Sequence, residues 1–459
     1  MSKTIHTIFL LVIITLPFTD FAGIKALGEH KQDLAAHILL VGVGVYYLML
    51  FLKKKITPIN SIIYQLYVLF FVWCIFAYFF NYTSISTSLF KGRAGNRQFI
   101  NQMIIYGMSI FGFVPFFHYV IGRYSSWEII RLMRKYMYYV LFFVFFVVML
   151  EILIGWYQVS FLKPLYDFIH TAIMRESGSE PSWSANRVTG VTYEPPYLAM
   201  YLMVVLPFML TYIYDNRKKL FTVALVFILV FLSGSRTALI VCIIQLFIFI
   251  VLLMRYVYTV GQNVKFLEKI VIASIVILPI IGGVVIEKIG GTISSLKLEK
   301  KYRENSLNVS NITRMATQLT AIEIFKEHPV TGVGLGQQGF YYVKNYPDWA
   351  VKLSYELRDQ YMNPTNPIWP PGYSLYTRLL CETGIIGFFL FIGTSLLMGY
   401  IGLRRLRQGQ EPIVLVMLLS LLAGQLLNSI QFDSLRSIPF WLLVSFMIVV
   451  INKKQRSEK

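Results

Sequence analysis

The chain has 459 residues, of which 56% are hydrophobic and only 14% are charged. A composition this apolar excludes an ordinary soluble domain and indicates a protein that lies in a lipid bilayer. The formal net charge of +19 does not by itself indicate nucleic-acid binding, because membrane proteins concentrate Lys and Arg in their cytoplasmic loops.

Apolar runs of the length that crosses a bilayer as a helix recur along the whole chain. They predict an all-α polytopic membrane protein, a single integral membrane domain over residues 1–459, with about twelve transmembrane helices. The first run follows Met-Ser-Lys and lacks a clear small-residue cleavage site, so we expect an uncleaved anchor. The expected spans are approximately 5–20, 34–52, 59–80, 99–121, 136–156, 195–214, 219–233, 236–255, 267–287, 382–403, 412–430 and 436–452.

The basic residues predict the orientation of these spans. About 21 of the 42 Lys and Arg residues fall on one side of a twelve-span arrangement, against roughly seven in the short connections opposite. Because cytoplasmic connections carry the excess of basic residues, both termini are predicted to be cytoplasmic. The residues on that side are Lys3, Lys53 to Lys55, Arg123, Arg131, Arg134, Lys135, Arg217 to Lys219, Arg255, Lys265, Lys269, Arg404, Arg405, Arg407, Lys453, Lys454, Arg456 and Lys459.

Two segments are too long and too polar to be simple connections. They cover residues 156–194 and 290–381, both on the side opposite to the termini, and are rich in Tyr, Trp, Pro and Arg. Long loops in compact proteins are usually functional or disordered; we expect these two to be periplasmic loops that contain short helices and bind substrate. Aromatic rings offer faces for sugars, or alternatively form an interfacial belt; the candidates are Trp183, Tyr341, Tyr342, Tyr346, Trp349 and Trp369.

Histidine and cysteine are arranged without the spacing of a metal or redox site. The six histidines form no His-x-x-x-His pair, and the acidic residues form no Asp-x-Asp cluster, so neither a metal nor another cofactor is expected. Cys74, Cys242 and Cys381 stand in apolar runs and are interpreted as small hydrophobic residues.

Two polar patches flank the sixth to eighth spans on the outer side. The first, residues 186–196, contains Arg187 and Glu194 directly before the sixth span; taken alone, it is best interpreted as a solvated ion pair. The second is the turn Ser-Gly-Ser-Arg at residues 233–236, which puts Arg236 at the start of the eighth span. Taken alone, that arginine is an anchor at a helix end.

Two further patches lie in and after the second long segment. Arg314 precedes a predicted amphipathic helix at 316–326 and a turn, residues 328–336, with alternating glycines. Such amides are able to approach an anion, although a structural turn is the simpler interpretation. The last patch is Tyr373-Ser374, nine residues, then Gly-x-x-Gly at 384–387, with Arg378 and Glu382 between; small residues there favour close helix packing.

The order and spacing of these patches resemble the O-antigen polymerase and ligase superfamily, most strongly from Arg187 to about Ile392. The resemblance implies about a dozen helices and a large periplasmic loop near the C-terminal end. It also implies that Arg236 and Arg314 bind a lipid diphosphate. In the ligase branch a histidine, the proposed base, stands where this chain has Tyr373, so the resemblance favours the polymerase branch.

The resemblance implies a metal-independent membrane glycosyltransferase. It would transfer a growing glycan from undecaprenyl diphosphate to the next lipid-linked repeat, at the periplasmic face of the bacterial inner membrane. A permanently charged guanidinium matches phosphate oxygens, so the diphosphate ligands are predicted to be Arg236 and Arg314, with Arg187 and Arg378 as further members. The predicted catalytic residues are Glu194, as the base, and Tyr373, which positions sugar or phosphate because a tyrosine with an ordinary pKa near 10 is a poor base.

The expected partners are the lipid-linked donor and acceptor, the bilayer and a polysaccharide chain-length regulator, with no nucleic acid. Two alternatives remain open at this point. An O-antigen ligase or other transferase of the superfamily would share the donor chemistry. A polysaccharide flippase or transporter would also have about twelve spans, but it would carry its distinctive residues near mid-membrane.

Overall fold

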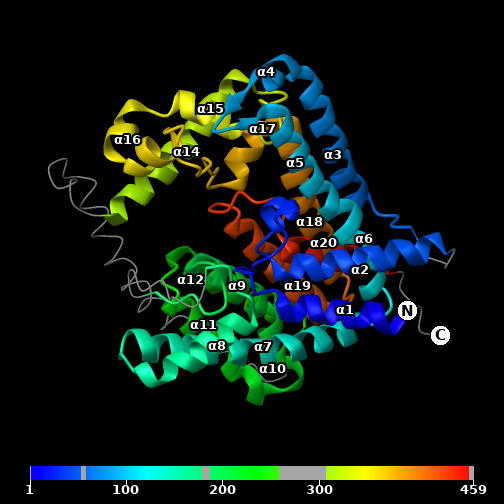
Figure 1. Ribbon diagram of the computed structural model, residues 1–459. Helices are drawn as coiled ribbons and strands as arrows, with labels where there is room; N and C mark the ends of the chain where they lie inside the picture. Colours follow the sequence, from blue (N-terminus) through cyan, green and yellow to red (C-terminus); the bar gives the residue numbers. More distant parts are fainter. Residues whose placement is uncertain (1, 53–57, 178–186, 258–305, 454–459) are drawn as a thin grey trace.

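The computed structural model describes residues 2–52, 58–177, 187–257 and 306–453, and these are almost entirely helical (Figure 1). The described part of the chain has seven helical segments long and apolar enough to cross a membrane. This confirms an all-α polytopic membrane protein. The seven segments are Leu34–Phe51, Ile62–Phe80, Gly95–Ile121, Ser126–Gly155, Pro195–Asp215, Arg236–Tyr256 and Leu375–Arg407.

The helices follow one another with short connections. The first half of the described chain contains α1 (Ser2–Thr15), η1 (Lys25–His30), α2 (Leu34–Phe51), α3 (Ile62–Phe80), α4 (Tyr82–Thr87), α5 (Gly95–Gly107), η2 (Met108–Phe113), α6 (Val114–Ile121), α7 (Ser126–Gly155), η3 (Ser160–Leu162) and α8 (Lys163–Ala172). A two-stranded antiparallel hairpin, β1 (Leu89–Phe90) and β2 (Arg93–Ala94), pairs Leu89 with Ala94.

The second half continues with α9 (Pro195–Leu210), α10 (Tyr212–Asp215), η4 (Arg217–Leu220), α11 (Phe221–Leu232), α12 (Arg236–Tyr256), α14 (Ser306–Glu327), α15 (Gln338–Asn345), α16 (Asp348–Leu353), η5 (Glu356–Tyr361), α17 (Leu375–Phe388), η6 (Phe389–Gly393), α18 (Thr394–Arg407), α19 (Pro412–Asn428) and α20 (Ile438–Asn452). Eleven of the expected apolar runs overlap these helices. The run expected at 267–287 lies outside the described residues.

Two helices begin well before their expected limits because their first turns are polar. Helix α7 starts at Ser126 rather than near 136, and a capping box starts it: Glu128 N donates to Ser125 Oγ at 3.2 Å, and Ser125 N donates to the Glu128 carboxylate at 3.0 Å. Such a box satisfies the free amides of a first turn. Helix α17 starts at Leu375 rather than at 382, because the charges of its first turns are paired inside the protein.

The connections before α3, α7 and α19 lie together with the C-terminal end of α20. Asn452 Nδ2 donates to the carbonyl of Asn60 at 3.0 Å, and Lys453 Nζ donates to Ser126 Oγ at 2.7 Å. Lys453 also pairs with Glu411 at 3.7 Å. These are connections that the basic residues predict on one side, so the fold groups them as expected; their assignment to the cytoplasm stays a prediction.

Helix α9 lies at the centre of the helix assembly. It packs against α7, α11, α12 and α19, and its residues from Leu198 to Leu210 are all buried except Met200. A helix that is apolar on every face belongs in the interior, which explains its composition. Its first residue, Pro195, follows Glu194 directly, so this central helix carries the predicted base at its N-terminal end.

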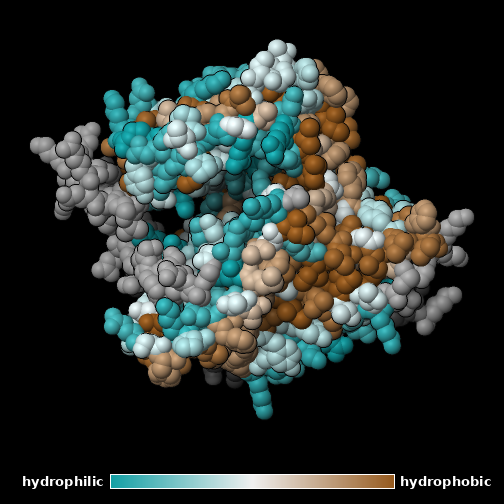
Figure 2. All heavy atoms as spheres, viewed as in Figure 1, coloured by the Kyte–Doolittle hydropathy of each residue, from teal (hydrophilic) through white to brown (hydrophobic). Residues whose placement is uncertain are grey.

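Helices α14 to α16 form a unit of their own, away from the two ends of the chain (Figure 1). Their side chains share a separate buried cluster that includes Ile312, Ala316, Tyr342 and Ala350, and Leu357 of η5 joins it. Figure 2 shows hydrophilic atoms over this unit and a broad hydrophobic area over α1 to α3. It also shows the surface hollowed between α14 and α16 on one side and α9 and α12 on the other, so elements far apart in the sequence face each other there.

Candidate active site

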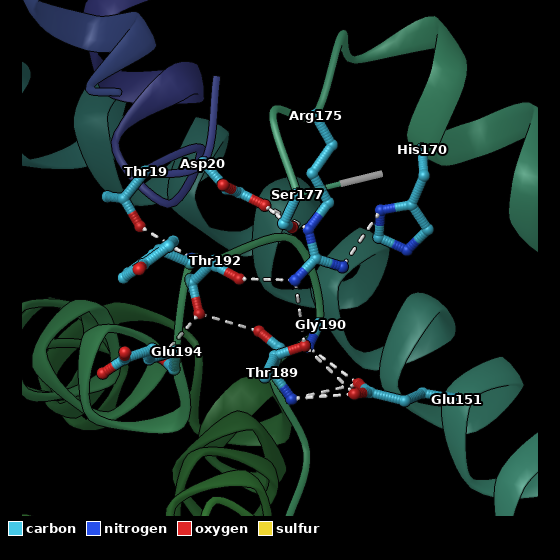
Figure 3. A network of polar contacts seen from close by, with 11 residues as sticks. Thr19, Asp20, Glu151, His170, Arg175, Ser177, Thr189, Gly190, Thr192 and Glu194 are labelled. Atoms are coloured by element: carbon cyan, nitrogen blue, oxygen red, sulfur yellow. Dashed lines mark hydrogen bonds and ion pairs between the residues drawn. The ribbon is translucent and has the colours of Figure 1, made fainter. Parts of the chain in front are cut away.

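A buried carboxylate on α7 holds the segment from Arg187 to Glu194. Glu151, 1% exposed, accepts hydrogen bonds from Thr189 N and Oγ1, each at 3.0 Å, and from Gly190 N at 2.8 Å (Figure 3). A carboxylate in an apolar helix is costly unless it is paired, and here the amides of the segment supply its partners. Glu151 therefore sets the position of the segment.

A second network ties the same segment to the residues that follow α1 and α8. Arg175 donates from Nε to Asp20 Oδ2 at 2.5 Å and from an Nη to the Thr192 carbonyl at 3.1 Å (Figure 3). Arg175 and Asp20 are both buried, so their opposite charges neutralise each other inside the protein. Glu194 stands at the end of this network, and its side chain points away from Glu151 (Figure 3).

The structure brings the first two patches together. Arg187 Nε donates to the Ser233 carbonyl at 2.8 Å. Gly234 has φ +66°, and a Cβ on it would lie 2.9 Å from Arg187 Nε, so only glycine fits beneath this guanidinium without displacing it. Ser235 then caps α12 by accepting from Ala238 N at 3.4 Å. Arg236 is the next residue, half-buried, and within the described chain it has no hydrogen bond or ion pair.

Arg314 and Tyr373 come from α14 and the residue pair before α17. The Arg314 guanidinium lies over the Tyr373 ring, 5.4 Å from its centre, and the Tyr373 hydroxyl shares a 2.5 Å hydrogen bond with that of Tyr361. Burial raises the pKa of Tyr373 to about 12, so this phenol is a weaker acid than an ordinary tyrosine and stays protonated at neutral pH. Its φ of +58° is strained for a side chain with a Cβ, at a cost of roughly 1–3 kcal/mol.

Glu194 lies within reach of the charges of two arginines. Partial removal from water raises the pKa of its carboxyl group, while Arg187 and Arg314 act in the opposite direction. Arg187 responds to the same surroundings: burial and the charge of Arg314 lower its pKa. One carboxylate and two guanidinium groups, from the segment 187–194 and from α14, therefore form one electrostatic group.

Arg378, the remaining predicted ligand, is not part of this group. It is 4% exposed and donates to the Glu382 carboxylate at 2.9 Å, to the Asp433 carbonyl at 2.7 Å and to Gln102 Oε1 at 2.8 Å. Each of its three nitrogens is used within the protein. The arrangement is that of a residue that joins α17 to α5 and to the connection before α20.

The glycine-rich turn at 332–336 binds a carboxylate of its own chain. Gly336 N donates to Glu382 Oε1 at 2.9 Å, and Val333 N donates to the Cys381 carbonyl at 2.9 Å. Gly384 has φ +64°, and a Cβ there would lie 2.1 Å from the Val330 carbonyl oxygen. These contacts support the simpler interpretation of the two patches at 328–336 and 384–387, which is a structural turn packed closely against a helix.

The predicted sugar-binding aromatic residues in and after helices α14 to α16 divide into two kinds. Tyr342 and Tyr346 are buried in the core of these helices and present no face to a sugar. Trp369 is half-buried, stacks with Arg93 at 4.9 Å and packs edge-on against Phe340. Trp349 is exposed and Tyr341 half-buried, whereas Trp183 lies outside the described residues.

Three residues that hold the segment 187–194 in place were not predicted from the sequence: Glu151, Asp20 and Arg175. Glu151 had a usable signal, since it is a lone carboxylate inside the apolar run 136–156 and such residues in membrane spans are seldom without a role. Asp20 and Arg175 are separated by more than 150 residues, and nothing in their local sequence indicates that they pair.

This fold and this group define a polytopic helical membrane protein with a cationic and acidic site at one end of its helices. Residues 221–392 match a family model described as O-antigen ligase. The match confirms the resemblance to the O-antigen polymerase and ligase superfamily over that region, which includes Arg236, Arg314, Tyr373 and Arg378. A comparison with curated proteins gives no match.

Proposed function

We propose that the protein is a surface-polysaccharide polymerase of the O-antigen type, acting at the periplasmic face of the inner membrane. It transfers a growing glycan from undecaprenyl diphosphate to a hydroxyl of the next lipid-linked repeat. The observation that carries the proposal is the match of residues 221–392 to the O-antigen ligase family, and the charges of Arg187 and Arg314 near the Glu194 carboxyl group support it. A base beside two permanent cations is what transfer from a diphosphate leaving group requires.

In the proposed reaction the anomeric carbon–oxygen bond to the diphosphate breaks and the acceptor hydroxyl oxygen forms the new bond. The hydroxyl proton goes to Glu194, whose raised pKa brings it closer to the working pH of a general base. Arg187, Arg236 and Arg314 stabilise the negative charge that collects on the diphosphate. Tyr373 holds sugar or phosphate by hydrogen bonding, and Arg378 supports α17 rather than touching the substrate.

Tyr373 supports polymerase over ligase. The position where the ligase branch has its proposed catalytic histidine here carries a phenol with a pKa of about 12, which is almost fully protonated at neutral pH and removes protons poorly. A ligase that transfers glycan to lipid A core is the second candidate, favoured because the matching family is described as O-antigen ligase. Both candidates use the same donor, so the acceptor decides between them.

The test is complementation of a gene disruption in the native host, with surface polysaccharide separated on a gel. Wild type is compared with Arg314→Ala, Arg236→Ala and Glu194→Gln, each at a checked membrane level. Lys326→Ala is the matched control, because Lys326 is also exposed on α14 and pairs only with Glu323 among the described residues. General-base catalysis contributes roughly 100- to 10,000-fold, so Glu194→Gln is expected to lose the ladder.

A polymerase predicts core bearing one repeat when the gene is disrupted, and restoration of the ladder by wild type and Lys326→Ala. Bare core with long lipid-linked chains accumulating would instead establish a ligase. A normal ladder from Glu194→Gln would remove Glu194 as the base while leaving the polymerase in place.

A further inference from the structure

A basic cavity lies at the end of α7 opposite to Glu151. Its volume is about 290 Å³, it is open on one side, and α7, α10 and the connection between α10 and α11 line it. The residues that line it are Arg131, Arg134, Lys135, Tyr138, Tyr139, Tyr212, Asp215, Asn216 and Lys219. Four are basic and one is acidic, so the cavity carries a net positive charge and suits an anion.

The cationic wall is held in place by the protein. Arg134 is 4% exposed, donates to Thr211 Oγ1 at 3.0 Å and to Asp215 at 2.5 Å, and lies 3.9 Å from the centre of the Tyr212 ring. Lys219 lies 4.6 Å from the centre of the Tyr138 ring. Asp215 neutralises Arg134, so the charges of Arg131, Lys135 and Lys219 remain to attract a ligand.

The cavity lies where the polar start of α7 meets its apolar part. The helix has 30 residues, which makes it about 45 Å long, whereas the hydrocarbon core of a bilayer is about 30 Å thick. Its sequence changes from charged to almost wholly apolar after Lys135. The lining therefore falls at the depth of lipid headgroups, a level that tyrosine favours.

Apolar side chains continue from the cavity along the outside of the helices. Phe142 packs against both Tyr138 and Phe221, and the exposed residues Phe146 on α7 and Phe221 on α11 extend this surface. A free anion would make no favourable contact with such an apolar surface. An anion attached to acyl chains would, because its chains would lie along the apolar residues while its phosphate occupied the cavity.

We propose that this cavity binds the phosphate headgroup of an anionic phospholipid. The site is separate from the candidate active site and lies at the end of the helices that the basic residues predict to be cytoplasmic. The lipid would join α7 to the connection between α10 and α11 and so anchor the central helix α9 at its inner end.

The test is native mass spectrometry of the full-length protein in detergent, titrated with dioleoylphosphatidylglycerol, with dioleoylphosphatidylcholine or with inorganic phosphate. The test variant is Arg131→Gln with Lys135→Gln, because both side chains are exposed and line the cavity. Arg404→Gln with Arg407→Gln is the matched control: it removes the same charge from exposed positions on α18 outside the cavity.

Wild type is expected to bind phosphatidylglycerol in preference to phosphatidylcholine. The cavity variant should bind it about 30-fold more weakly, the effect of losing two basic residues at a membrane surface, while the control variant should stay within about twofold of wild type. Equal loss in both variants would mean that net charge alone attracts the lipid and would overturn the proposal. So would full competition by inorganic phosphate, which would identify a free anion as the ligand.

Discussion

Replacing Glu151 with alanine is expected to loosen the segment that carries Arg187 and Glu194 while the helices stay folded. The change removes the acceptor of two backbone amides and one hydroxyl, all buried. Hydrogen bonds to a charged group contribute roughly 1.5–3 kcal/mol each, and they do not add fully. A total of about 3–5 kcal/mol is therefore expected for closing this segment. Glu151→Gln keeps one acceptor oxygen and should cost about half as much.

Trypsin cleavage after Arg187 measures this directly, because Arg187 is half-buried and bonded to Ser233 in the closed segment. When opening is fast, the cleavage rate follows the open population, and 3 kcal/mol corresponds to about a 100-fold increase. Glu323→Ala, which removes an exposed carboxylate on α14, should leave the rate within about twofold. Cleavage of Glu151→Ala at the wild-type rate would refute the assigned role of Glu151.

Arg378→Ala should lower the melting temperature in detergent by an amount equivalent to about 3–5 kcal/mol, because it leaves the buried Glu382 unpaired; a normally stable but inactive variant would instead support substrate contact. Polymerisation in vesicles should decline as pH falls through the raised pKa of Glu194, and Arg314→Gln, which removes a charge that lowers this pKa, should move the acid limb to higher pH. An acid limb at the same pH in Arg314→Gln would show that the charge of Arg314 does not act on Glu194. Burial and the charge of Arg175 lower the pKa of His170 from 6.5 to about 4; its contribution to stability is thus complete above about pH 6.5 and is lost as pH falls towards 4, and His170→Gln should flatten the dependence of melting temperature on pH in that window. Tyr373→Phe should keep the gel ladder with less than about a tenfold loss of rate, since it removes a hydrogen bond and no base; complete loss would make the phenol catalytic in its own right.

Hydropathy was sufficient to predict the limits of the membrane helices whose ends are apolar. The expected run 34–52 became α2, Leu34–Phe51, and 59–80 became α3, Ile62–Phe80. It failed at α7 and α17, where polar residues continue the helix beyond the apolar part. A capping box begins α7, and Arg378 paired with Glu382 lies inside α17. Hydropathy does not count such side chains as helical, although a capping box lets exposed residues begin a helix and pairing lets Arg378 and Glu382 be buried in one.

The sequence predicted the individual patches of the candidate site but not how they lie relative to one another. Arg187 with Glu194, the turn before Arg236, and Arg314 with Tyr373 were each visible in the sequence because their residue types suit a diphosphate or stand at a helix end. The position of the segment 187–194, which carries Arg187 and Glu194, depends on Glu151, Asp20 and Arg175. Those contacts join residues far apart in the chain, for which local sequence carries no signal.

Composition and apolar periodicity alone determined that this protein is helical and lies in a membrane, because the cost of exposing unpaired backbone groups to lipid leaves few other structures open to such a chain. Only the tertiary structure decided which arginines are available to a ligand. Arg378 has every nitrogen bonded inside the protein, whereas Arg314 is exposed beside Tyr373. The two arginines have the same chemistry, and their different roles follow from what packing places around each guanidinium.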